Sequence, residues 1–134
     1  MSFEIVAKWL NNQKQPRGAI SGASKYRNKP VVSREGYRFD SRAERTRWDV
    51  LMLQLQCGLI SELQRQVPFV LAPSVQIKGK SRKSPAIRYV ADFVYRDANG
   101  HVVVEDVKGK ITEGYRIKRH LMAAQGIQIT EIKA

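Results

Sequence analysis

The stretch Val102-Val103-Val104-Glu105-Asp106-Val107-Lys108-Gly109 decides the fold of this chain. It opens with β-branched apolar residues, which predict a strand, and it closes with two acids and a lysine. Side chains alternate between the two faces of a strand, so Asp106 and Lys108 are expected on one face. Glu105 and Val107 are expected on the other. The end of this strand therefore presents an acid and a base side by side.

The preceding strand should bring a second acid to the same place. Asp97-Ala98-Asn99-Gly100 is typical of a hairpin turn, because Asn-Gly readily adopts positive φ angles. Asp92 interrupts the apolar and aromatic strand before this turn, where a carboxylate without a counter-charge is costly. Two carboxylates and a lysine at one sheet edge suit a hard divalent cation such as Mg²⁺. The alternatives are a structural acid paired with an arginine, for Asp92, and a surface ion pair, for Asp106 and Lys108.

A third acid is expected on the first helix of the core. Ser41 and Glu44 form a capping-box pattern, and Gly58 is a natural stop at the other end of the helix. Trp48 and Leu51 follow Glu44 at helical spacing, which puts Glu44 on the core-facing stripe. Two interpretations remain open: Glu44 completes the cap, or it contributes to a site with the other acids.

Periodicity and turn residues predict an α/β domain over residues 36–134, preceded by a basic arm with a short helix over residues 1–35. The domain has the order helix, three-stranded antiparallel meander, helix, strand. Its expected elements are a helix over 41–57, strands over 66–71, 87–95 and 101–108, a helix over 115–124, and a strand over 127–132. A basic loop over 73–85 joins the first two strands, and Pro68 suits an edge position in the first.

Charge indicates the class of partner. Lys and Arg number 24 against 12 Asp and Glu, a formal net charge of +12, which favours binding to polyanions. Nucleic acid is the first candidate; an anionic membrane surface, an acidic protein or a merely solvated basic surface are the alternatives. The candidate phosphate-binding residues are Lys25, Arg27, Lys29, Arg42, Lys78, Lys80, Arg82, Lys83, Lys110, Arg116 and Arg119.

The composition also excludes several classes of protein. Cys57 is the only cysteine, so the chain forms no intramolecular disulfide and no cysteine zinc cluster. No run of about 18 apolar residues predicts a membrane span. The first residues lack the basic and long apolar regions of a secretory signal. We therefore expect a cytoplasmic protein.

These motifs resemble those of a known nuclease superfamily. Ala91-Asp92, followed on the next strand by Asp106-Val107-Lys108, is similar to the signature of PD-(D/E)XK nucleases. The order of elements resembles their restriction-endonuclease-like core. Within the superfamily, residues 36–132 look most like small phage-encoded endonucleases related to Holliday junction resolvases. Ala91 stands where the signature has a proline, a substitution that the superfamily commonly allows.

The resemblance implies a Mg²⁺-dependent endodeoxyribonuclease, with Mn²⁺ able to substitute, and the catalytic residues Glu44, Asp92, Asp106 and Lys108. Both aspartates would bind the metal, with the Val107 carbonyl as a further ligand, and Glu44 would complete the metal or water shell. Lys108 would position or help to deprotonate the attacking water, or stabilise charge on the phosphate. Gln66 is a further candidate, with an ordinary polar strand-end residue as its alternative.

The resemblance further implies DNA, branched or duplex, as the partner, in phage recombination or replication inside the host cytoplasm. The sequence carries no recognition helix, zinc finger or dense aromatic platform, so we expect recognition of structure rather than of sequence. Junction cleavage needs paired incisions, which predicts a homodimer. Two alternatives remain. One is a non-catalytic nucleic-acid-binding protein on the same fold; the other is a nuclease subunit acting on DNA ends in a recombination or transposition complex.

Overall fold

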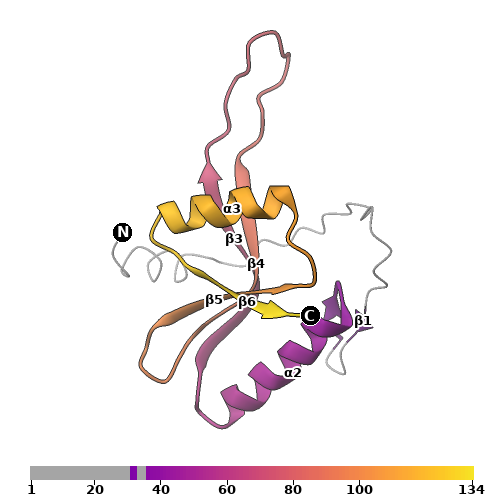
Figure 1. Cartoon of the computed structure of the whole chain (residues 1–134), viewed down its shortest axis with the longest axis vertical. Coiled ribbons are helices and arrows are strands. Elements are labelled where there is room, and N and C mark those ends of the chain that lie inside the picture. The colour runs from indigo at the N-terminus through magenta and orange to yellow at the C-terminus, as the bar shows by residue number, and fades with distance from the viewer. Residues whose placement is uncertain (1–30, 33–35) are drawn as a thin grey trace.

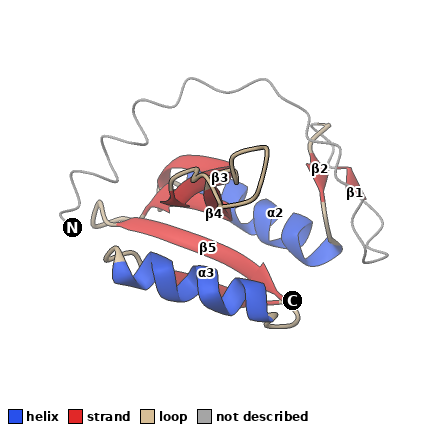
Figure 2. Ribbon diagram, turned by 90° about the horizontal axis from the view of Figure 1, so that it is seen from above, coloured by secondary structure: helices blue, strands red, loops and turns tan. Residues whose placement is uncertain are grey.

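A four-stranded mixed sheet carries helices packed on both of its faces (Figures 1 and 2). The structure, a computed structural model, describes residues 31–32 and 36–134. Nearly all of the expected basic arm, including Lys25, Arg27 and Lys29, lies outside the described residues. None of the helices in the described part of the chain is long and apolar enough to cross a membrane.

The predicted α/β class and order of elements are confirmed. Strands β3 and β4 pair antiparallel, as do β4 and β5, and β6 pairs parallel with β5 to give the order β3-β4-β5-β6. The elements are β1 (Val31–Val32), β2 (Arg38–Phe39), α2 (Arg42–Gln56), β3 (Ser61–Ala72), β4 (Ile87–Arg96), β5 (Val102–Lys108), α3 (Glu113–Ala124) and β6 (Ile129–Lys133).

Helix α2 begins and ends where its sequence predicts. The Ser41 hydroxyl accepts the backbone N–H of Glu44 at 3.1 Å, and Gly58 adopts φ +73° just beyond the last turn. Glu44, Trp48 and Leu51 are the buried residues of the helix. The expected stripe is therefore confirmed, with a glutamate at its N-terminal end.

Strand β3 is longer than predicted, because it starts at Ser61 rather than at Gln66. The added segment is polar, so no apolar alternation indicates it, yet it pairs with the far end of β4, where Ser61 lies opposite Arg96. Glu62 and Gln66 both have positive φ angles, and the register shifts after Ser61. Pro68 lies on the edge strand of the sheet, as expected. The short β1–β2 ribbon was not predicted.

Two hydrophobic clusters fill the two faces of the sheet. Strand β5 shows their separation, since Val104 packs in one cluster while Val103 packs against the other. The buried residues of the α3 cluster are Val67, Phe69, Tyr89, Ala91, Val94, Val104, Tyr115 and Met122. Those of the α2 cluster are Phe39, Trp48, Leu51, Ile60, Phe93 and Tyr95.

At Asp92, strand β4 loses its pairing with β5, and the alternation of its side chains between the two faces of the sheet is interrupted. Regular alternation would put Ala91 and Phe93 on one face, but Ala91 packs in the α3 cluster and Phe93 in the α2 cluster. The pairing of β4 with β5 ends at Phe93, opposite Glu105, while the pairing with β3 continues to Ile87. The first half of β4 thus leaves β5 and runs on with β3 alone (Figure 1). Asp92 lies at this fork.

Candidate active site

The Asp92 side chain joins β4 to β5 at the point where the two strands separate. Its Oδ2 accepts the backbone N–H of Val107 at 2.8 Å, beyond the last pairing of β4 with β5. Its Oδ1 accepts a longer hydrogen bond, 3.4 Å, from Nε2 of Gln66. Among the residues that the structure describes, no arginine pairs with Asp92. Its partners in this part of the chain are instead a backbone amide and the Gln66 side chain.

Asp106 and Lys108 lie on one face of β5, as the alternation predicts. Asp106 is 3% exposed, and its Oδ2 accepts the Tyr89 hydroxyl at 2.8 Å. Its Oδ1 lies 3.2 Å from Nζ of Lys108, which sits 4.4 Å from the centre of the Tyr115 ring. The lysine side chain is 29% exposed and can reach a bound molecule, whereas the carboxylate is buried. This pair is not a surface ion pair.

Gln66 connects Glu44 to the aspartates. Its Nε2 donates to Oε1 of Glu44 at 3.1 Å as well as to Asp92. Glu44 is 4% exposed, so its carboxylate enters the site from the buried side of α2. Gln66 has φ +53°, an uncommon conformation for a residue other than glycine. The structure thus brings Gln66 together with two of the expected catalytic residues, and their roles stay predictions.

Burial of several carboxylates in one place raises their proton affinity. Burial is the main cause that raises the pKa of Asp92 from 3.8 to about 8. Its hydrogen bond with Asp106 and the charges of Glu44 and Asp106 add to this effect, while the Val107 amide opposes it.

Burial also raises the pKa of Glu44. The charge of Asp40 also raises the pKa of Glu44, whereas the charge of Arg65 lowers it. The net rise in the proton affinity of Glu44 and Asp92 means that the site favours an added proton or an added cation.

The donor set fits a magnesium ion held by few protein ligands. Within residues 36–134, no three Asp, Glu, His or Cys side chains form a group that could hold a metal by themselves. Mg²⁺ commonly needs only one or two carboxylates, with waters and substrate oxygens completing its shell. Asp92 accepts the amide of Val107, the residue next to Asp106, and the charge of Asp106 acts on it, so the two carboxylates are neighbours. Val107, between Asp106 and Lys108 in the chain, is the residue whose carbonyl is the further candidate ligand. The direct metal role expected of Glu44 stays a prediction.

The sequence model of one protein family, described as "Protein of unknown function (DUF1064)", matches residues 23–133. The chain belongs to the DUF1064 family. Searches among curated proteins and among solved structures find no match for it. The DUF1064 match includes every candidate catalytic residue, and it begins early enough to include Lys25, Arg27 and Lys29.

The opposite face of β5 holds a second buried acid in this DUF1064 chain. Glu105 is 1% exposed and accepts two hydrogen bonds from Arg47 of α2, at 2.7 and 2.6 Å. The Tyr95 hydroxyl donates to the same carboxylate. Hydrogen bonding to Glu105 raises the pKa of Arg47, and burial is the main cause that raises the pKa of Tyr95 to about 12. This cluster fixes α2, and with it Glu44, against β5.

Sequence reasoning missed partners of the two buried acids of β5. Tyr89 donates to Asp106 from β4, and Arg47 binds Glu105 across 58 positions of sequence. Alternation does signal Tyr89, which shares a strand face with Ala91. Arg47 carries no such signal, because it is one of several arginines on α2.

The described cations expected to bind phosphate fall into two groups. Arg42, Lys110 and the four cations of the 73–85 loop are exposed and form no ion pair with another residue that the structure describes. Arg116 instead pairs with Glu113 at 2.6 Å, and Arg119 pairs with Glu131 at 2.7 Å. The two α3 arginines therefore have different acidic partners.

Proposed function

We propose that this DUF1064 chain is a metal-dependent nuclease of the PD-(D/E)XK type that hydrolyses phosphodiester bonds in DNA. One observation supports it most strongly: Asp92, Asp106 and Lys108 converge where β4 leaves β5, on the face that also receives Tyr115 of α3. A surface ion pair needs no buried carboxylate, and a structural acid needs no neighbouring acids. A metal-dependent phosphodiesterase uses neighbouring carboxylates to hold its cation.

The order of elements supports a restriction-endonuclease-like arrangement. Helix α2 precedes the antiparallel strands β3, β4 and β5, and α3 precedes the parallel strand β6. In this arrangement α2 contributes Glu44, and the two central strands contribute the metal-binding acids and the lysine.

Each residue of the site has a distinct part in the proposed reaction. A divalent cation supplies acidification of water and neutralisation of phosphate charge. Asp92, Asp106 and the Val107 carbonyl would hold it. The Lys108 ammonium, fixed by Asp106 and the Tyr115 ring, donates to the attacking water or to the phosphate oxygens. Gln66 and Glu44 hold Asp92 in its orientation.

The proposal extends to branched DNA as the preferred substrate, cleaved by a homodimer in phage recombination or replication. The net charge of +12 supports binding through the phosphate backbone, which carries no sequence information by itself. Cutting a junction needs two incisions on opposing strands, and a two-fold symmetric pair of sites supplies them.

The test uses the purified full chain, wild type and Asp106→Asn, with Asp49→Asn as a matched control on the exposed face of α2. Labelled four-way junction, linear duplex and single-stranded DNA are incubated with Mg²⁺, with Mn²⁺ or with chelator. Cleavage by wild type and the control, dependent on metal and lost in Asp106→Asn, is the expected result. Metal-independent binding by all three proteins without cleavage would leave a non-catalytic binding protein. Cleavage confined to linear ends would favour an end-processing nuclease.

A further inference from the structure

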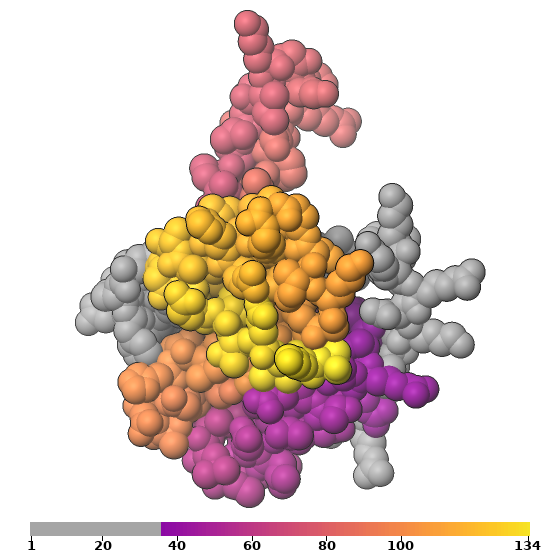
Figure 3. All heavy atoms as spheres, in the orientation of Figure 1, coloured from indigo at the N-terminus to yellow at the C-terminus, as the bar shows by residue number. Residues whose placement is uncertain are grey.

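The connection between β3 and β4 is a hairpin held by its own backbone hydrogen bonds. Beyond the last strand pair, Val75 and Ser84 form an antiparallel bridge with backbone hydrogen bonds of 3.0 and 2.7 Å. The backbone N–H of Lys80 closes the tip by donating to the Ile77 carbonyl at 3.1 Å, and Gly79 supplies the φ of +81° that this turn needs. The hairpin stands out from the body of the molecule (Figures 1 and 3). It therefore has a defined shape and a tip that faces outward.

The hairpin carries no acid, and its tip is strongly basic. No acid occurs between residues 73 and 91, and the tip carries four exposed cations within six residues: Lys78, Lys80, Arg82 and Lys83. None of them forms an ion pair with another residue that the structure describes. Like charges held this close repel one another, so the tip is poised for a polyanion.

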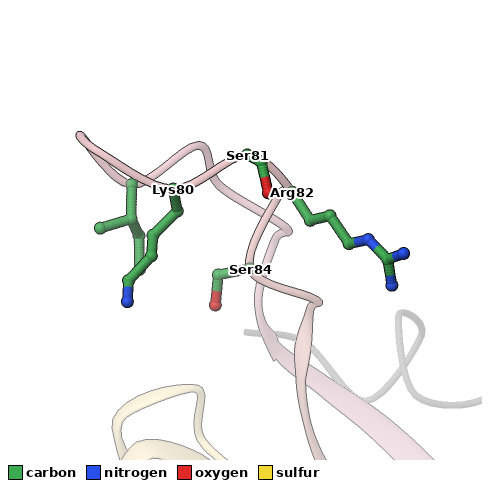
Figure 4. Close-up of a pocket in the computed structure, with 5 residues that line it drawn as sticks. Lys80, Ser81, Arg82 and Ser84 are labelled. Carbon is green, nitrogen blue, oxygen red and sulfur yellow. The ribbon is translucent and has the colours of Figure 1, made fainter.

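Side chains of the tip extend to both sides of the ribbon. Lys80 and Arg82 point away from each other, with Ser81 and Ser84 between them (Figure 4). Together with Ile77, these residues line a shallow hollow at the tip. Ile77 is 47% exposed, and such an apolar side chain suits contact with a thymine methyl group. The tip thus combines cations on its flanks with an apolar and hydroxyl surface in the middle.

We propose that this hairpin inserts as a two-stranded ribbon into the major groove of duplex DNA. The proposal rests on the proposed function for its choice of nucleic acid. A major groove about 12 Å wide admits a two-stranded ribbon, whereas a minor groove of about 6 Å does not. The arm from Pro73 to Gly79 spans roughly 20 Å if extended, enough to cross the depth of the groove. Cations on the two flanks then meet the phosphates of the two walls.

The hairpin is also continuous with the two strands that carry part of the candidate site. Its second arm continues as β4, and Ile87 lies roughly 15–20 Å along the strand from Asp92. Its first arm leaves β3 beyond Gln66. The length of β4 therefore limits how far from the tip a phosphate that enters the site can lie.

The experiment measures binding rather than cleavage, so it does not depend on nuclease activity. Fluorescence anisotropy of a labelled duplex is recorded in chelator over a salt series. The tip variant replaces Lys78, Lys80, Arg82 and Lys83 by glutamine. A control variant loses the same charge through glutamine at Arg38, Arg45, Lys118 and Lys133, exposed or half-buried cations that are not expected to bind phosphate. Thermal unfolding checks that both variants fold as wild type does.

We expect the tip variant to bind about tenfold or more weakly, with a salt slope reduced by about 2 to 4, and the control to lose much less. If the control variant lost as much affinity for duplex DNA as the tip variant, the hairpin would not be the docking element. Wild-type binding should also fall on a duplex whose major groove is filled by glucosylated 5-hydroxymethylcytosine, and netropsin in the minor groove should not compete.

The opposite pattern of groove competition, or equal binding to duplex RNA with its inaccessible major groove, would overturn groove insertion. If no protein cleaves DNA but this binding pattern holds, the nuclease proposal fails and the hairpin proposal stands. If cleavage occurs and the tip variant binds and cuts normally, the hairpin proposal fails alone.

Discussion

The carboxylate of Asp92 accepts the backbone N–H of Val107 at 2.8 Å, just beyond the last pairing between β4 and β5. This bond joins two strands at the point where they part. Val107 lies between Asp106 and Lys108 on β5, so the bond also brings the Asp92 carboxylate next to both residues. One side chain therefore holds the fork closed and contributes a charge to the candidate site.

Asp92 should make the metal-free protein less stable as pH rises. Its folded-state pKa, about 8, exceeds the ordinary value of 3.8, so the folded chain binds more protons than the unfolded chain between these pH values. The free energy of unfolding contributed by this group then falls between pH 4 and pH 8. Asp92→Asn keeps an acceptor for the Val107 amide and removes the titration. We expect urea unfolding in chelator at pH 5 and pH 8.5 to show this difference. The free energy of unfolding of the variant, relative to that of wild type, should be at least about 1 kcal/mol higher at pH 8.5 than at pH 5.

Millimolar Mg²⁺ supplies the control for that comparison. It should raise the unfolding temperature of wild type at pH 8 and leave that of Asp92→Asn nearly unchanged, because a ligand stabilises only the state that binds it. Equal pH dependence in both proteins would contradict the expected titration of Asp92.

Gln66 should matter for activity rather than for stability. Gln66→Gly removes the amide between Glu44 and Asp92 while accepting the left-handed backbone at φ +53° without strain. We expect an equal or higher unfolding temperature and a loss of about tenfold or more in the cleavage rate, as for residues that orient metal ligands.

Glu62→Gly is the matched control, because Glu62 has φ +54° on the same strand and lies outside the site. It should keep the wild-type cleavage rate. Loss of activity in both variants would mean that the backbone conformation of β3, and not the Gln66 amide, matters.

Lys108 should act on the reacting groups. Lys108→Gln removes the ammonium held by Asp106 at 3.2 Å but keeps a polar side chain over the Tyr115 ring. Single-turnover cleavage should slow by about 100-fold or more, as when a charge-stabilising donor is lost. Duplex binding in chelator should change little. The exposed neighbour Lys110 gives the control, and a Lys110→Gln variant that slows as much would contradict a specific role for Lys108.

Arg47 should be important for stability. Arg47→Met leaves the carboxylate of Glu105, 1% exposed, without its bidentate partner in the interior. Breaking such a pair costs about 3 kcal/mol or more, measured by urea unfolding. The exposed pair of Arg116 and Glu113 is the comparison, and Arg116→Met should cost about 1 kcal/mol or less. Combining Arg47→Met with Glu105→Gln should recover part of the loss, because no uncompensated charge then remains.

Local periodicity predicted the parts of this protein that depend on neighbours in sequence. Alternation put Asp106 and Lys108 on one face of β5 and Glu105 on the other, and helical spacing put Glu44 on the buried stripe of α2. The order of elements follows from the same periodicities. The polar start of β3 at Ser61 was missed, because a strand held by pairing with β4 needs no apolar alternation.

The sequence by itself thus determined which residues could form a site, and the tertiary structure decided how they meet. At Asp92 the side chains of β4 stop alternating regularly, because Ala91 packs in the α3 cluster and Phe93 packs in the α2 cluster. No local sequence pattern encodes this change. The left-handed Gln66 reaches Glu44 and Asp92 only because β3 and α2 pack together around them. Arg47 reaches Glu105 because α2 packs against β5, and Tyr89 reaches Asp106 from the neighbouring strand β4. Burial leaves each of these polar groups with only the partners that packing brings within reach, and it costs free energy to leave them unpaired.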